Sequence, residues 1–435
     1  MNWNKIQLIL NHLIIICGFC LLLYALLNPS KSIGTLDTSL FGTLYLTNGF
    51  DSIIFTSIII YGILILYSIK SKMVQQIDIL LFLFMLIFAI ILSLQSLRDV
   101  HTYSLLIIAN MCIFSIIFIC FSFVRKYAVY AKYYKIVLYG VFVLYSVYIF
   151  YAIYFNKELP VSNIIYHYDT EQRLSIMFSN PNHLGNFLAF GIIYLFCTVI
   201  MTSKRWIALL WCTITILIIG LIHTYSRGAW LGCIVGFIIA ILYLKTRVVT
   251  RVLIKNVVIL TIIIVVSLLI TPNGYLSVFN RVSHSHPSMD ASVGHRIDIL
   301  KSAFLITYDH WISGVGIGQF GDVLERGYKP PYLKNIYYVS SMNNYITLAA
   351  EVGVPATLLY ILCIGIACII ASKRLSNGFS SASEIGMLCG VYSMLIFACT
   401  TYTLGQIYAI VLMWSVLGYL VAIPQQSREN KDDIQ

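Results

Sequence analysis

An arginine stands alone between two hydrophobic stretches, in the segment HTYSRGAWLG at residues 223–232. Upstream runs IALLWCTITILIIGLI and downstream runs CIVGFIIAILYL, so Arg227 has almost no loop around it. Ser226 suits a helix cap, Gly228 allows close backbone approach, and Trp230 is typical of a membrane surface. A helix beginning here would place its positive dipole end beside a guanidinium, which together suit a phosphate or diphosphate. An arginine that simply extends to the membrane surface is the alternative.

A second arginine, Arg296, follows His295 in the polar stretch SVGHRIDILKSAF. Here the alternative to an anion site is a solvated charge paired with Asp298 or Asp290. The apolar residues Ile297, Leu300, Phe304 and Leu305 recur in this stretch at helical spacing and predict a helix.

A third polar stretch, RLSIMFSNPNHLGNFLAF, begins at Arg173. Its Asn180-Pro181-Asn182 sequence predicts a turn that starts a helix, with asparagine amides available to an outer cavity. A plain helix-start turn is the alternative interpretation.

Most of the chain is far more apolar than the elements above. Of its 435 residues, 60% are hydrophobic and 10% are charged, which indicates a polytopic membrane protein. A bilayer core needs about 20 apolar residues per helix. On that rule we expect about twelve spans, at residues 6–28, 52–68, 77–95, 103–124, 134–155, 186–201, 206–223, 229–245, 253–270, 353–371, 384–403 and 407–423.

Basic residues set the expected orientation. They gather in the short loops and tails of one side, such as Lys72, Lys132, Arg247, Arg251 and Lys373. By the positive-inside rule this side is cytoplasmic, so both termini are expected inside and the polar stretches outside. The net charge of +11 is then mostly topological and predicts no nucleic-acid partner.

The sequence predicts four regions, all α-helical. Residues 1–155 form an N-terminal bundle of five helices, and 156–271 contain helices six to nine after an outer loop at 156–185. Residues 272–352 form a large, mostly helical external subdomain between helices nine and ten. Residues 353–435 contain the last three helices and a cytoplasmic tail.

Three further patterns do not indicate a catalytic or binding site. Residues 316–321 read GIGQFG, but a dinucleotide site needs a strand before and a helix after such a motif, so tight glycine turns are the better interpretation. His284, His286 and His295 have only Asp290 nearby and no cysteine set, so we predict no metal site and no cofactor. The cysteines fall within spans and indicate no disulfide framework.

Four segments taken in order resemble the O-antigen ligase / O-antigen polymerase family. They are RLSIMFSNPNHLGNFLA, TYSRGAWLG, GHRIDILKSAFLITYDHWISGVGIGQF and NNYITLAAEVGVPATLLY, and the resemblance covers roughly residues 173–370. It implies a GT-C-type glycosyltransferase of the inner (cytoplasmic) membrane with its active site on the periplasmic side. Such an enzyme passes a glycan from undecaprenyl diphosphate to a sugar hydroxyl, on lipid A core for ligases or on a carrier-linked repeat unit for polymerases. A flippase and a chain-length regulator are the implied protein partners.

The resemblance also implies roles for residues. Arg227 and Arg296 match the arginine positions that would hold the diphosphate leaving group. Substrate contacts are expected from Arg173, Asn180, Asn182, Tyr225, Ser226, Asn343 and Asn344.

One position departs from the ligase pattern. Ligases carry a histidine just before the asparagine that starts the helix preceding span ten, whereas this chain reads SSMNNY with Met342 there. Methionine cannot accept a proton, which favours a polymerase over a ligase. His295 and Glu351 are the substitute bases, although Glu351 equally suits a packing or helix-end role.

A transporter of lipid-linked glycans is the competing class, because twelve spans also suit a transporter. It predicts repeats and ionisable groups near the bilayer midplane. The charges here sit at span ends and in the external stretch, which favours the enzyme.

Overall fold

The computed structural model describes residues 3–27, 117–155, 173–270 apart from 179, 201 and 203, 291–333, 338, 340–376, and 381–422 apart from 405. Over these residues the chain is helical and contains no strand, as the sequence predicts. The predicted spans 52–68 and 77–95 lie outside the described residues, and of 103–124 only 117–124 is described, in a helix that continues to 126. The total of about twelve spans therefore stays a prediction.

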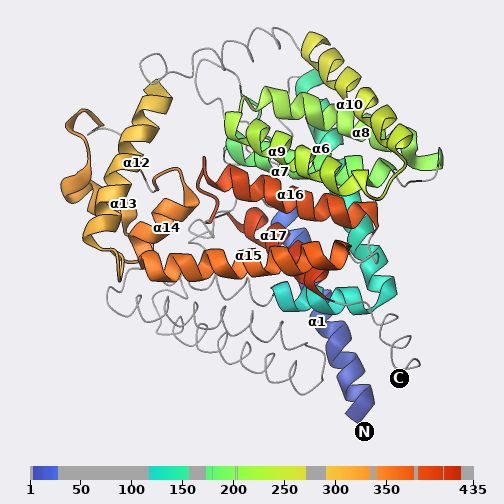
Figure 1. Ribbon diagram of the computed structural model, residues 1–435, viewed down its shortest axis with the longest axis horizontal. Coiled ribbons are helices and arrows are strands. Elements are labelled where there is room, and N and C mark those ends of the chain that lie inside the picture. Colours follow the sequence, from blue (N-terminus) through green and yellow to red (C-terminus); the bar gives the residue numbers. More distant parts are fainter. Residues whose placement is uncertain are drawn as a thin grey trace.

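The described membrane helices follow the predicted spans closely. Six are long and apolar enough to cross a membrane: α6 (Ala128–Phe155), α7 (Pro181–Ile200), α8 (Lys204–His223), α9 (Arg227–Lys245), α10 (Thr250–Ile270) and α15 (Val354–Ser376). α1 (Trp3–Leu27), α16 (Ala382–Ala398) and α17 (Ile407–Val421) are also apolar. The chain is thus a multi-pass membrane protein (Figure 1).

Close glycine contacts pack α16 against α7 and α9 at the centre of the bundle. A Cβ at Gly386 would lie 2.9 Å from the Tyr194 Cα, and one at Gly232 would lie 2.7 Å from the Ser393 carbonyl oxygen. Small residues at such positions let helix backbones approach each other in a membrane. α7, α9 and α16 are therefore held in a fixed relation to one another.

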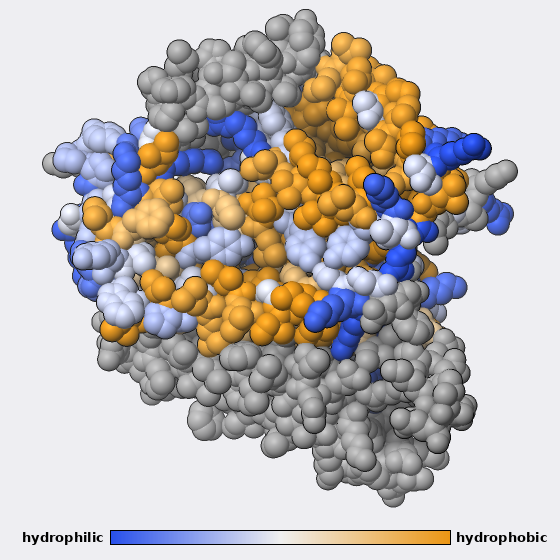
Figure 2. Space-filling model, viewed as in Figure 1, coloured by the Kyte–Doolittle hydropathy of each residue, from blue (hydrophilic) through white to orange (hydrophobic). Residues whose placement is uncertain are grey.

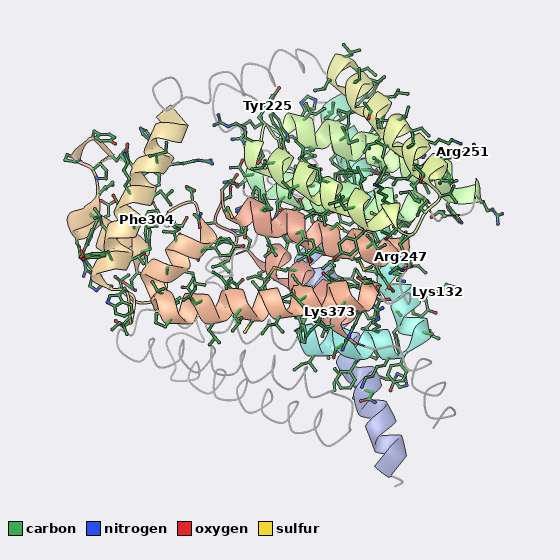
Figure 3. The ribbon with its side chains drawn as sticks, viewed as in Figure 1. Lys132, Tyr225, Arg247, Arg251, Phe304 and Lys373 are labelled. Atoms are coloured by element: carbon green, nitrogen blue, oxygen red, sulfur yellow. The ribbon has the colours of Figure 1, made fainter. Side chains whose placement is uncertain are left out.

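Basic side chains mark one end of the bundle. Figure 3 shows Lys132, Arg247, Arg251 and Lys373 at the end of the molecule opposite to Phe304 of α12 (Ala291–Asp309). This separation matches the charge pattern behind the predicted orientation. The cytoplasmic position of the two termini stays a prediction.

A buried ionic network joins four helices near the basic end. Glu384 of α16 accepts from Arg125 Nη2 at 3.1 Å and from Lys135 Nζ at 2.9 Å, and the Tyr419 hydroxyl donates to it at 3.1 Å. The side chains of Arg125 and Glu384 are only 5% and 6% exposed. A charge buried this deeply is tolerated because it is paired and hydrogen-bonded.

Replacing Glu384 with alanine is expected to destabilise the bundle by about 3–5 kcal/mol, because Arg125 would then be buried without its carboxylate. Thermal unfolding in detergent measures this. The control is Asp298→Ala, which breaks a pair whose Lys301 partner is 70% exposed and is expected to cost no more than about 1 kcal/mol. An equal loss of stability in both variants would contradict the interpretation.

The subdomain that the sequence predicts to be external is helical in its described part, and its external position stays a prediction. It comprises α12, α13 (Phe320–Val323), the short π-helix η2 (Leu324–Tyr328), η3 (Pro331–Leu333) and α14 (Asn344–Val352), around a separate small core. Figure 1 shows α12, α13 and α14 gathered at one end of the bundle.

The predicted helix is present as α12, but Ile297, Leu300, Phe304 and Leu305 do not form its buried side. Ile299, Ala303 and Ile306 are fully buried, whereas Phe304 and Leu305 are 55% and 57% exposed. The physical reason is that α12 carries apolar residues on two sides, and spacing alone does not say which side the subdomain covers. The buried side, which packs against α14, carries the small residues Ser302 and Ala303.

Candidate functional site

The connection between α16 and α17 is the centre of the candidate site. Span eleven was expected to reach residue 403, but α16 ends at Ala398, and residues 399–404 and 406, here called the outer connection, leave the helix. The expected end is wrong because Thr400, Thr401 and Thr403 interrupt the apolar run, and the helix stops before them. Residues of α7, α9, α12 and α14 contact the outer connection, as the following paragraphs describe.

The start of α9 lies against Thr400. Ser226 is the N-cap, and its Oγ accepts from the Ala229 amide at 3.4 Å, which confirms the predicted cap. Arg227 is the first residue of α9 and is partly buried. A Cβ at Gly228 would lie 2.1 Å from the Thr400 Oγ1, so the backbone next to Arg227 touches the outer connection.

Arg296 reaches the same threonine from the external subdomain. Its Nη1 donates to the Thr400 carbonyl oxygen over 3.4 Å. Arg296 and the residue after Arg227 thus both contact Thr400, although 69 positions separate the two arginines in the sequence. Figure 2 shows hydrophilic residues bordering a hollow between the α12 side of the molecule and the apolar mass of α8, α9 and α10.

The start of α14 is fixed to the outer connection by two asparagines. Asn343 caps α14 by accepting from the Tyr345 and Ile346 amides, and its Nδ2 donates to the Cys399 carbonyl oxygen at 2.9 Å. Asn344 Nδ2 donates to Thr403 Oγ1 at 2.7 Å, while the Thr403 amide donates back to Asn344 Oδ1 at 2.6 Å. The predicted substrate contacts Asn343 and Asn344 are therefore engaged in positioning this segment.

The start of α7 forms the third side. Asn180 Oδ1 accepts from the Asn182 amide at 2.8 Å, and the helix begins at Pro181, as predicted. Arg173 donates to Asn182 Oδ1 and to the Thr224 carbonyl oxygen, both at 2.9 Å, and so links α7 to the α8–α9 turn. His183, which we had not singled out, is buried and its Nε2 donates to the Tyr402 carbonyl oxygen at 3.1 Å.

Three helix N-termini therefore surround one short segment. The unpaired amides of a helix N-terminus carry a partial positive charge. Together with Arg227, Arg296 and Arg173, they make this junction electropositive at the end of the bundle opposite to most basic loop residues.

Backbone strain marks the same three helix starts. In the described chain, three residues other than glycine have positive φ: Met177 at 58°, Tyr225 at 48° and Met342 at 59°. Each lies a few residues before the start of α7, α9 or α14. Left-handed conformations at such residues cost energy and gather at functional sites. The Met342 side chain packs against the core of the external subdomain.

The two candidate bases differ in surroundings. His295 lies next to Arg296 and is partly exposed. Glu351 is 3% exposed and lies beside the glycine turn at residues 316–321, where the Gly318 and Phe320 amides donate to it. Burial raises its pKa to about 8, and the two amides oppose that shift. Gly314, Gly316 and Gly318 all have positive φ, which supports the turn interpretation of GIGQFG.

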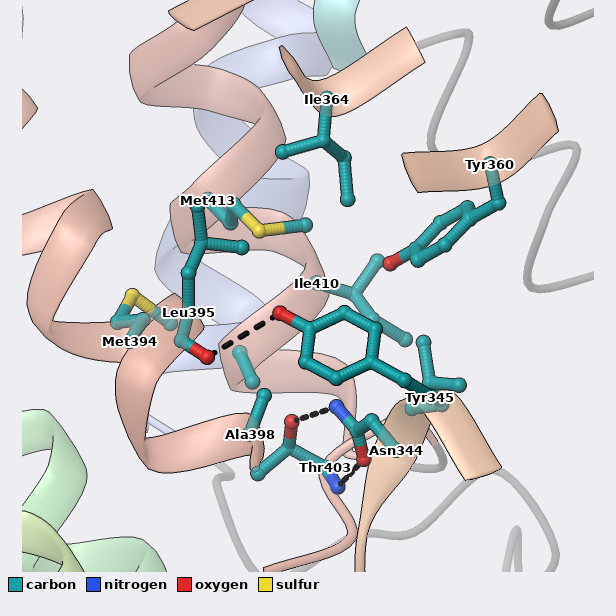
Figure 4. A pocket seen from close by; sticks show the side chains of 12 residues that line it. Asn344, Tyr345, Tyr360, Ile364, Met394, Leu395, Ala398, Thr403, Ile410 and Met413 are labelled. Atoms are coloured by element: carbon teal, nitrogen blue, oxygen red, sulfur yellow. Dashed lines mark hydrogen bonds between the residues drawn. The ribbon is translucent and has the colours of Figure 1, made fainter. Parts of the chain in front are cut away.

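An apolar pocket lies beside the outer connection, between α14, α15, α16 and α17 (Figure 4). Its polar wall is already paired, because Asn344 bonds Thr403 and the Tyr345 hydroxyl donates to the Leu395 carbonyl oxygen at 3.1 Å. The pocket therefore offers mostly hydrocarbon contacts, and its lining contains no Asp, Glu, Lys, Arg or His side chain. Within the described ranges, no three His, Cys, Asp or Glu side chains gather closely enough for a metal, while His284 and His286 lie outside those ranges.

Gly228→Ala is expected to lower the rate of the protein's reaction about tenfold, because the new methyl group would overlap Thr400 Oγ1 and displace the start of α9. Combining it with Thr400→Ala removes that oxygen and should restore most of the activity. Gly365→Ala is the matched control, since nothing lies within 4 Å of its Cβ position. Unchanged activity in a well-folded Gly228→Ala variant would contradict the placement of α9 against the outer connection.

Glu351→Gln tests whether this residue is a base or a structural group. We expect activity within about threefold of wild type, because the side chain serves the glycine turn. The raised pKa means that the folded protein holds a proton that the unfolded chain releases, so stability should fall as pH rises from about 4.5 to about 8, and Gln should remove this fall. Thermal midpoints across this pH range measure it. A loss above about 100-fold with an intact fold would instead make Glu351 the base.

The comparisons bear on the same region. Residues 212–361 match the family model described as O-antigen ligase, a range that begins in α8 and ends in α15. It therefore includes Arg227, Arg296 and the start of α14. A search of the curated proteins finds none that matches the chain.

Proposed function

We propose that this chain, whose residues 212–361 match the O-antigen ligase family model, is a membrane glycosyltransferase that polymerises undecaprenyl-diphosphate-linked repeat units on the outer face of the cytoplasmic membrane. The family supports an O-antigen ligase or polymerase type of glycosyltransferase acting on a lipid-linked glycan. The undecaprenyl carrier, the polymerase activity and independence from metal ions belong to the proposal.

One observation carries the proposal: Arg296 and the backbone beside Arg227 meet at Thr400. A diphosphate is small enough to contact both guanidiniums from such a junction, and the first turn of α9 adds amide donors. A scaffold protein without catalytic function would have no use for this convergence of arginines and helix starts.

The proposed reaction is a displacement at the anomeric carbon. The acceptor hydroxyl oxygen forms a bond to the anomeric carbon while the bond between that carbon and the phosphate oxygen breaks. Undecaprenyl diphosphate leaves with one additional negative charge. Arg227 and Arg296 stabilise that charge as it develops. His295, beside Arg296 and partly exposed, is the proposed acceptor of the hydroxyl proton.

Met342 favours the polymerase over the ligase. At the expected histidine position, Met342 has a left-handed backbone conformation and its side chain packs against the subdomain core. It therefore positions the start of α14 and cannot accept a proton. Transfer to lipid A core, the ligase activity, is the alternative.

A lipid-linked glycan transporter is the second alternative. In the described spans, the buried ionic network around Glu384 lies near the basic end of the bundle and already pairs its charges. This arrangement supports a structural role and lends the transporter no support.

Reconstitution separates these functions. The purified chain in liposomes would receive an undecaprenyl-diphosphate-linked repeat unit from its host. We expect glycans longer than one repeat together with released undecaprenyl diphosphate. Movement of the substrate between leaflets without release would support the transporter, and release only after lipid A core is added would support the ligase.

A further inference from the structure

The helix α12 presents apolar side chains on two opposite sides. At about 100° per residue, Ile297, Phe304 and Tyr308 fall on one side and Ile299, Ala303 and Ile306 on the other. The second side is fully buried in the subdomain core. The first is open: Phe304 is 55% and Tyr308 80% exposed. A helix with water on its outer side would carry polar residues there.

The open side of α12 continues into a membrane-spanning helix. Trp311 and Ile312, which follow α12, are 56% and 62% exposed, and the Val354 amide that begins α15 donates to the Trp311 carbonyl oxygen at 2.8 Å. α15 then exposes Leu358 and Leu362 on its own surface. Figure 2 shows mostly hydrophobic residues along α15, and hydrophobic residues among hydrophilic ones over α12, on the same face of the molecule.

The direction of α12 fits the edge of a bilayer. Figure 1 shows α12 crossing the direction of α15, so it runs along the membrane surface if α15 spans the membrane. Its open side combines Phe and Leu with Tyr308 and Trp311, the aromatic types found where hydrocarbon meets headgroups. Lys301 on the same side is 70% exposed and long enough to reach lipid phosphates.

We propose that α12 is an interfacial helix whose open side, formed by Ile297, Phe304, Leu305, Tyr308, Trp311 and Ile312, lies in the outer leaflet at the boundary between headgroups and acyl chains. The occupant of this surface is phospholipid. The helix that carries Arg296 is thereby held at headgroup depth, whatever reaction the site performs.

Photocrosslinking of the full chain in its native membrane tests this directly. p-Benzoylphenylalanine in place of Tyr308 should attach to lipid acyl chains, read as lipid-mass adducts of the purified protein. Tyr332 is the matched control, because it is 66% exposed and belongs to the same subdomain but lies outside the open side. We expect at least about fivefold more lipid adduct at position 308 than at 332.

Two crosslinking results would overturn the proposal. One is a crosslinked dimer of the chain at position 308, which would make the surface a contact between copies. The other is an equally low yield of lipid adduct at both positions. A second measurement needs no unnatural residue. The emission lost in Trp311→Phe, measured as a difference from wild type, should be quenched by phospholipids brominated near the headgroup. Quenching by aqueous iodide alone would also overturn the proposal.

Discussion

Replacing Arg227 with alanine is expected to lower the rate of glycan transfer by at least about 100-fold, the usual cost of removing a charge-stabilising donor from a transition state. Arg227 begins α9, where the helix dipole and the guanidinium act on the same anion. Arg227→Lys should recover only part of the rate, because lysine keeps the charge and loses the two-pronged geometry. Initial rates with saturating lipid-linked donor measure the effect.

The matched control for Arg227 is Arg251→Ala. Arg251 is an exposed arginine near the start of α10, at the basic end of the bundle, and should be dispensable for transfer. Full activity in a well-expressed Arg227→Ala variant, or an equal loss in the control, would exclude the diphosphate role.

Arg296→Ala is expected to lower the rate of glycan transfer about 10- to 100-fold. It removes the second positive charge that stabilises the leaving group, and it also removes a contact to Thr400. Thr400→Ala is the control here, because it leaves the backbone carbonyl that Arg296 contacts.

The double variant decides whether the two arginines act together. If they hold one diphosphate, Arg227→Ala combined with Arg296→Ala should lose less than the product of the two single losses. Losses that multiply would place the arginines on separate groups of the substrate.

The local parts of this site could be predicted from the sequence. Ser226, Pro181 and Asn343 start helices because of chemistry within a few residues of each, and the structure has helix starts at all three. The left-handed backbone at Tyr225 and Met342 could not be predicted, because these residue types do not favour it.

The long-range parts could not be predicted either. The outer connection lies inside an apolar run, and only its threonines hint that the helix stops. The pairing of Arg125 with Glu384 joins residues 259 positions apart, which no local pattern indicates. The apolar residues of α12 show in the sequence as helical spacing. Which of its two apolar sides is buried in protein depends on where the subdomain packs, and no local pattern indicates that.

The central claim is that the chain lengthens a lipid-linked glycan with Arg227 and Arg296 on the diphosphate. The most direct measurement is the length distribution of the surface glycan in a host strain that lacks this protein and expresses wild type, Arg227→Ala or Arg296→Ala. The account predicts single repeat units on the surface acceptor in the deletion strain and long chains only with wild type. Long chains accumulating on undecaprenyl diphosphate would contradict it, because only their transfer to the acceptor would then be missing.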